Sequence, residues 1–220
     1  MTRKRVGVLI SGRGSNLQAL IDAAKDPCYP AELVLVVSNV PGAQGLARAE
    51  EAGIATSTID HKGFASREDF DAALDAKLGE AGVELLCNAG FMRLHTEGFV
   101  ARWLNRHLNI HPSLLPAFRG LHTHARVLDE GVKVTGCTVH FVRPAMDEGP
   151  IVAQAAVPVH PGDTPDSLAA RVLEAEHRLY PHGLRLVASG AVRVEGDHVV
   201  GMTQEKGQSA LFSPPLDGTL

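Results

Sequence analysis

A continuous apolar run that ends in a glycine-rich turn constrains the fold of this chain more than any other feature. Residues 6–10 read VGVLI, and the turn at 11–16 reads SGRGSN. An apolar run without alternation is typical of a strand that is buried on both faces. The segment 15–26 that follows has apolar residues at helical spacing. The opening therefore predicts a strand–turn–helix unit of an α/β protein.

The alternation of strand and helix continues through the first half of the chain. Further strands are predicted at 32–39, 56–60, 83–90 and 107–111, and further helices at 45–53 and 66–82. Two adjacent strands, 134–142 and 151–159, are followed by a long helix over 163–190 and a hairpin around 195–197. We therefore predict an open, mostly parallel twisted sheet with helices on both faces, Rossmann-like in outline, plus a C-terminal β-hairpin.

Composition bounds the domain organisation and the partners. Hydrophobic residues make up 45% of the 220 residues and charged residues 21%, which are ordinary values for a globular chain. The net charge of -4 argues against a nucleic-acid partner, and no apolar stretch reaches the roughly 18 residues of a membrane span. The three cysteines show no CxxC spacing, so we expect a cytoplasmic protein. We expect a single domain over 1–205, with lobes at 1–110 and 111–205, and a tail at 206–220.

The turn after the first strand is a candidate anion site. A glycine-rich turn before a helix presents free backbone N–H groups to a ligand. Leu17 occupies the place of the third glycine of a dinucleotide motif, and the second strand does not end in an acidic residue. These two differences favour a single phosphate, held by backbone N–H groups and the side chains of Ser15 and Asn16. The alternative is a plain turn with Ser15 as helix cap.

Three polar residues from distant segments form a candidate acyl-transfer site. Asn109 and His111 stand two apart in a predicted strand, which places both side chains on one face. Asp147 lies in the turn MDEGP between the next two strands. Asn109 and His111 can donate hydrogen bonds to a developing oxyanion, and Asp147 can favour the charged imidazole and take part in proton transfer. A structural histidine is the alternative.

The histidines also raise the question of a metal. Five of the eleven histidines fall within residues 107–140, and His122 and His124 have ligand-like spacing. The chain has no HExxH motif, and no cysteine stands beside this pair. We therefore predict no metal.

Several segments, in order, resemble the glycinamide ribonucleotide formyltransferase family. They are ISGRGSNLQAL, FMR, NIHPSLLP, GLHTH, VTGCTVHFV, DEGP and ARVLEAEHRLYP, and the resemblance covers about residues 5–190. It implies the formyltransferase version of the Rossmann-like fold. It also implies transfer of a formyl group from 10-formyltetrahydrofolate, as co-substrate, to the amine of glycinamide ribonucleotide in purine (IMP) biosynthesis. The products would be formylglycinamide ribonucleotide and tetrahydrofolate.

The resemblance also implies roles for individual residues. Asn109, His111 and Asp147 would be catalytic. The acceptor substrate would be bound by Gly14, Ser15 and Asn16 at its phosphate, and by Leu173, Glu174, Ala175 and Glu176 at its glycinamide end. The folate would be bound by Arg67, Met92, Arg93, Leu94, His95, Asn109, Arg143, Pro144, Ala145, Met146 and Asp147, with Arg67 at its glutamate tail. The alternatives are a solvated charge for Arg67, an exposed helix carboxylate for Glu176 and a core side chain for Met92.

The resemblance implies small-molecule substrates as partners, with no nucleic acid and no membrane. It implies a monomer or a homodimer as the oligomeric state. Two alternative functions share the same catalytic residues. One is formyltetrahydrofolate hydrolase, in which water replaces the amine, and the other is a formyltransferase with another amine acceptor. A regulatory nucleotide-binding module would explain the glycine turn, but it would leave the three polar residues unexplained.

Overall fold

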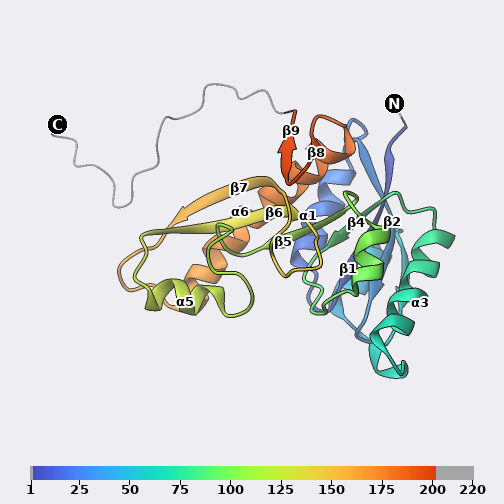
Figure 1. Ribbon diagram of the computed structural model, residues 1–220, viewed down its shortest axis with the longest axis horizontal. Coiled ribbons are helices and arrows are strands. Elements are labelled where there is room, and N and C mark those ends of the chain that lie inside the picture. Colours follow the sequence, from blue (N-terminus) through green and yellow to red (C-terminus); the bar gives the residue numbers. More distant parts are fainter. Residues whose placement is uncertain (1, 202–220) are drawn as a thin grey trace.

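The computed structural model describes residues 2–201 and forms a seven-stranded sheet covered by helices (Figure 1). The strands of this sheet are β1 (Lys4–Ile10), β2 (Ala31–Ser38), β3 (Ala55–Thr58), β4 (Leu85–Asn88), β5 (His107–His111), β6 (Val134–Phe141) and β7 (Ile151–Pro158). The helices are α1 (Ser15–Ala24), α2 (Gln44–Glu51), the 3-10 turn η1 (His61–Gly63), α3 (Arg67–Glu80), α4 (Glu97–Arg102), α5 (Thr123–Asp129) and α6 (Pro165–Ala188). The predicted tail at 206–220 lies outside the described residues.

The sheet is mostly parallel, with the strand order β3-β2-β1-β4-β5-β6-β7. The four pairings from β3 to β5 are parallel, and β5–β6 and β6–β7 are antiparallel. The strand order reverses direction between β1 and β4, and open sheets bind ligands at such a switch point, beyond the carboxyl ends of the strands. A separate hairpin is formed by β8 (Arg193–Glu195) and β9 (His198–Val200). The predicted sheet and the predicted terminal hairpin are both confirmed.

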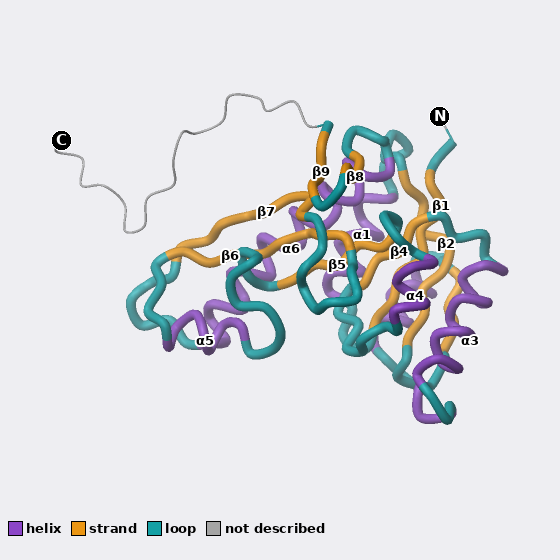
Figure 2. Tube along the Cα trace, viewed as in Figure 1, coloured by secondary structure: helices purple, strands orange, loops and turns teal. Residues whose placement is uncertain are grey.

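The core has two layers because strand residues alternate between the faces of the sheet. Val6, Val8 and Ile10 of β1 belong to a cluster that includes α1 and α6, whereas Leu9 belongs to a cluster with α3 and α4. This explains why the run at 6–10 is apolar at almost every position. Figure 2 shows α3 and α4 on one side of the sheet and the long α6 passing behind β5 and β6.

The start of α6 is fixed by a capping box at Thr164. The Thr164 hydroxyl accepts the Ser167 N–H at 3.2 Å, and the Ser167 hydroxyl accepts the Thr164 N–H at 3.0 Å. Pro165 is the first residue of the helix, where a missing N–H costs little. Val172, Glu176 and Leu179 are buried on one face, so the helix directs a carboxyl group inward. Within residues 2–201 no helix has the length and apolar character that crossing a membrane requires.

Candidate active site

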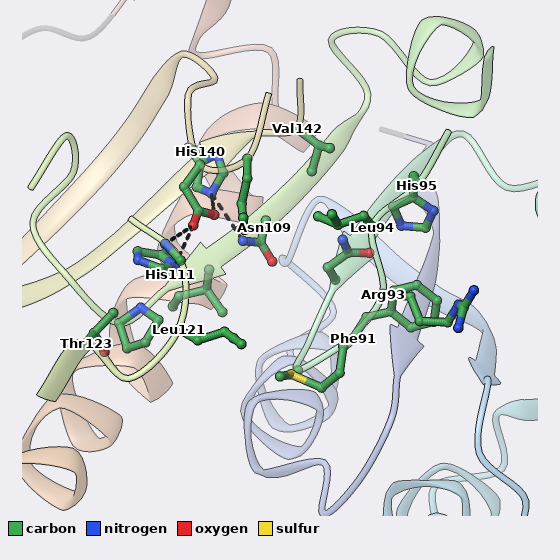
Figure 3. A pocket seen from close by; sticks show the side chains of 18 of the residues that line it. Phe91, Arg93, Leu94, His95, Asn109, His111, Leu121, Thr123, His140 and Val142 are labelled. Atoms are coloured by element: carbon green, nitrogen blue, oxygen red, sulfur yellow. Dashed lines mark hydrogen bonds and ion pairs between the residues drawn. The ribbon is translucent and has the colours of Figure 1, made fainter. Parts of the chain in front are cut away.

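A cleft of about 640 Å³ opens beside the carboxyl ends of β4 and β5 (Figure 3). This volume is within the usual range for small-molecule sites. Four segments contribute most of the lining, and Asn16, Asn88, Val100 and Glu176 complete it. The segments are 90–95, 109–112, 120–124 and 140–147. The cleft therefore combines residues from both halves of the chain.

The glycine turn is shaped by backbone packing. Gly14 has a φ of 73° and directly precedes α1, and a Cβ on it would lie 2.7 Å from the Gly45 Cα. The Gly45 N–H donates to the Gly12 carbonyl at 3.0 Å, which holds the turn against α2. No side chain caps α1, so its first N–H groups remain available to a ligand. Gly14 and Ser15 stand just outside the cleft lining, while Asn16 is part of it.

A hydrogen bond joins the glycine turn to α6. The Asn16 Nδ2 donates to the Glu176 Oε2 at 2.7 Å, and the Asn16 Oδ1 is buried without a protein partner. Glu176 is only 6% exposed, and burial raises its pKa to about 7 although the hydrogen bond from Asn16 lowers it. The cleft thus contains a carboxyl group that titrates near neutral pH. Among the predicted neighbours on α6, Leu173, Glu174 and Ala175 do not line the cleft.

His111 and Asp147 face each other at the base of the cleft. The His111 Nδ1 lies 3.3 Å from the Asp147 Oδ2, and the His111 Nε2 lies 3.0 Å from the Phe118 carbonyl oxygen. A carbonyl oxygen only accepts hydrogen bonds, so Nε2 carries a proton. Since Nδ1 faces a carboxylate, both ring nitrogens of His111 face hydrogen-bond acceptors. The predicted proximity of these two side chains is present in the structure.

Asn109 is oriented by a histidine that the sequence reasoning did not assign to the site. Asn109 and His140 stand opposite each other in the β5–β6 ladder, and the Asn109 Nδ2 lies 3.1 Å from the His140 Nε2. Burial lowers the pKa of His140 to about 4, against the Phe141 hydrogen bond and the Asp147 charge, which raise it. The ring is therefore neutral, with its proton on Nδ1 toward the Phe141 carbonyl at 3.1 Å. Asn109 then donates to Nε2 and keeps its second N–H for a ligand.

Asp147 is fixed by its turn. Its φ is 56°, in the left-handed region, and its Oδ2 accepts the Gly120 N–H at 2.9 Å. Its Oδ1 lies 3.7 Å from the His140 Nε2, so one carboxylate contacts both histidines. A Cβ on Gly149 would lie 1.6 Å from the Phe141 carbonyl oxygen, which only glycine avoids. This close approach explains the glycine of the DEGP turn.

One wall of the cleft is formed by residues 91–95, called here the folate loop after the ligand that the sequence resemblance implies for it. Met92 and Leu94 are 67% and 56% exposed. Leu121 and Met146 are exposed apolar side chains of other lining loops. Exposed apolar side chains gathered around a cleft indicate a ligand surface. The Met92 N–H donates to the Ser11 hydroxyl at 2.8 Å, which ties this loop to the glycine turn.

The cleft does not include every residue that the sequence predicted. Arg67 is the first residue of α3 and is exposed, so its side chain does not reach the lining. Arg143, Pro144 and Met146 line the cleft, but Ala145 does not. The Arg143 Nη2 donates to the Asn105 Oδ1 at 2.6 Å, which places this guanidinium beside the end of α4. Within residues 2–201 no group of three or more His, Cys, Asp or Glu side chains is arranged as a metal site.

Comparisons with known proteins identify the fold and its relatives. The formyl transferase family model matches residues 4–184. The chain is 45% identical to the phosphoribosylglycinamide formyltransferase of Escherichia coli, over 85% of this chain and 88% of that protein. It is 57% identical to a trifunctional purine biosynthetic protein from Gallus gallus over 86% of this chain, which spans only 19% of that protein. A glycinamide ribonucleotide transformylase structure from Symbiobacterium toebii superposes with a TM-score of 0.87 at 49% identity, covering 90% and 93% of the two chains.

Proposed function

Because the chain belongs to the formyl transferase family, we propose that it transfers a formyl group from 10-formyltetrahydrofolate to the amine of glycinamide ribonucleotide. The observation that carries the proposal is the placement of Asn109, His111 and Asp147 in one cleft. That cleft also contains exposed apolar side chains of the folate loop and the partly buried Asn16–Glu176 hydrogen bond. These features suit a donor with flat rings and a small polar acceptor.

The folate loop and the loop at 143–147 form the proposed donor site. Met92 and Leu94 offer apolar surface to the pterin and benzoyl rings. A folate bound there would bring its N10 formyl group to the base of the cleft, where Asn109 and His111 lie. Arg67 remains a candidate for the glutamate tail from the first turn of α3.

The acceptor site is proposed at the junction of the glycine turn and α6. The open N-terminus of α1 suits a phosphate, because its unpaired N–H groups and the helix dipole both favour an anion. Glu176 is buried and titrates near neutrality, so it can pair with the amine of the acceptor. Asn16 contacts Glu176 directly and stands two residues after Gly14, which makes the proposed phosphate and amine sites neighbours.

The proposed reaction is an acyl transfer through a tetrahedral intermediate. The amine nitrogen bonds to the formyl carbon and loses a proton, the bond from that carbon to N10 breaks, and N10 gains a proton. The formyl oxygen becomes negative in between, and the free N–H of Asn109 is the donor proposed to stabilise it, next to the His111 ring, whose nitrogens face Phe118 and Asp147. Asp147 balances the charge of His111 and holds its ring in place.

The function is tested by measuring formyl loss from 10-formyltetrahydrofolate with and without glycinamide ribonucleotide. Consumption that requires the ribonucleotide, with one formylated acceptor formed for each tetrahydrofolate, is the expected result. Equal loss without the acceptor would identify a hydrolase instead. Transfer to a different amine, with none to glycinamide ribonucleotide, would identify another acceptor. The absence of any formyl loss would indicate a protein that binds its ligands without catalysing transfer. The Asp147→Asn variant is the matched control, because it removes the charge beside His111 while keeping the side-chain size.

A further inference from the structure

A buried histidine closes the folate loop at its far end. The His95 ring stacks on the Phe91 ring at 5.1 Å and on the Phe99 ring at 4.5 Å, with interplanar angles of 9° and 11°. Its side chain is 3% exposed. Because Phe91 and His95 are the two ends of the loop, their stacking holds Met92–Leu94 as a closed turn. Figure 3 shows His95 on the side of the cleft away from His111.

A carboxylate on α3 supports this turn from behind. The Asp71 Oδ1 lies 3.5 Å from the His95 Nδ1, and the Asp71 Oδ2 accepts the Thr96 N–H at 2.7 Å. Burial by itself would raise the pKa of Asp71, but the contact with His95 and the hydrogen bond from Thr96 lower it overall. Asp71 is therefore a buried carboxylate whose partners are the last residue of the folate loop and the residue after it. Removing one partner of a buried carboxylate lowers the stability of the fold around it, because the charge is left uncompensated.

Of the basic side chains near the folate loop, His95 is the one that faces Asp71. His107 meets the His95 ring edge-on at 5.0 Å, and burial holds the pKa of His107 well below its usual value, so that ring is neutral. The His107 Nε2 pairs with the Asn88 Oδ1 at 2.9 Å. The neighbouring cation, Arg93, lies over the Phe70 ring at 5.5 Å. Both ring nitrogens of His95 are buried without a hydrogen-bond partner among the described residues, and Nδ1 is the one that has the Asp71 carboxylate within 3.5 Å.

We propose that Asp71 and His95 are positioning residues for the donor: they fix the shape of the folate loop without reacting themselves. The inference rests on the proposed function, in which Met92–Leu94 bind the folate. The acceptor site at Asn16 and Glu176 is built from other elements, α1 and α6. Loss of the Asp71–His95 contact should therefore weaken folate binding and leave acceptor binding unchanged.

Two single variants and their combination test this. His95→Phe keeps a ring between Phe91 and Phe99 but removes the nitrogen that faces Asp71. Asp71→Asn keeps an oxygen for the Thr96 N–H but removes the charge. For each, we expect the Kd for tetrahydrofolate, measured by calorimetry, to rise about tenfold, or about 1.4 kcal/mol. The KM for 10-formyltetrahydrofolate should rise in parallel, with kcat and the acceptor KM within twofold. The double variant should resemble either single one, because the two residues act together.

Asp75 provides a matched control on the same helix. Its carboxylate accepts the Trp103 Nε1–H at 3.0 Å and contacts the Arg102 Nε at 2.8 Å, so it also joins α3 to the region of α4. Asp75→Ala should lower the melting temperature and leave the Kd for tetrahydrofolate unchanged.

Three results would overturn the inference. They are an equal loss of folate affinity in Asp75→Ala, equal increases in both KM values, and wild-type folate affinity in both His95→Phe and Asp71→Asn. If the wild-type protein itself does not bind tetrahydrofolate, the proposed function fails as well. Wild-type binding combined with unaffected variants overturns the positioning role alone.

Discussion

Replacing Glu176 by glutamine should stabilise the free protein at alkaline pH and weaken acceptor binding. The pKa of Glu176 is about 7 in the folded chain and 4.5 for an ordinary glutamate. Between these values the folded state holds a proton that the unfolded state has released, so stability falls as pH rises. The loss is complete above about pH 7 and amounts to about 3 kcal/mol. Glutamine removes this loss because it is never ionised, and its amide oxygen still accepts from Asn16.

The assay is thermal and urea unfolding of the wild type and Glu176→Gln at pH 5 and pH 8. At pH 8 we expect the variant to be more stable by about 3 kcal/mol, or about 6–12 °C in melting temperature. At pH 5 the difference should be under about 1 kcal/mol, because the wild-type carboxyl is then protonated in the folded state. The acceptor KM at pH 8 should rise at least about tenfold, since a buried charged partner is lost.

Glu174→Gln is the matched control, because Glu174 lies on the same helix and is exposed. Its stability should stay within about 0.5 kcal/mol of wild type at both pH values. A stability difference for Glu176→Gln that is the same at pH 5 and pH 8 would refute the linkage argument. A variant that is less stable than wild type at pH 8 would show that the carboxylate is well compensated in its buried site.

Three further predictions concern the base of the cleft and the folate loop. Asp147→Asn should lower kcat by at least about a hundredfold at an unchanged melting temperature, because His111 loses its counter-charge; near-normal turnover in steady-state assays would remove Asp147 from the mechanism. Ser11→Ala should raise the KM for 10-formyltetrahydrofolate about fivefold, since the Met92 N–H loses its acceptor, and an unchanged KM would contradict this. His140→Gln should reduce the loss of stability that acid titration measures between pH 6.5 and 4. The wild-type ring is neutral in the folded chain, with a pKa of about 4, and binds a proton on unfolding. Identical unfolding profiles for the variant and the wild type over this pH range would contradict the prediction.

The sequence predicted the fold where burial leaves a local pattern. Val6, Val8 and Ile10 pack on one face and Leu9 on the other, so the first strand is apolar throughout and was easy to locate. Helices α4 and α5 span 6 and 7 residues, too short for a clear apolar period, and they were not predicted. Helix α6 has 24 residues and a complete capping box, and its start was predicted correctly.

The candidate site was only partly accessible to sequence reasoning. Asn109 and His111 could be placed together because strand periodicity is local. His140 could not be placed beside Asn109, because that contact depends on the antiparallel register of β5 and β6, which no local signal specifies. The burial of Glu176 also depends on how α6 packs on the sheet, so its raised pKa has no sequence signature.

The two carboxyl groups of the cleft are suited to different tasks because their surroundings differ. Asp147 accepts the Gly120 N–H and faces the His111 Nδ1, so its carboxylate has polar partners in the site. Glu176 has one hydrogen bond, from Asn16, and otherwise only burial. An α-amino group has a pKa of about 8, so it arrives at neutral pH largely protonated and must lose that proton before it can attack. A carboxyl group with a pKa of about 7 is a far better acceptor for that proton than an ordinary carboxylate. In the proposed reaction, Glu176 would therefore be the group that takes the proton of the amine, while Asp147 would hold the His111 ring in place.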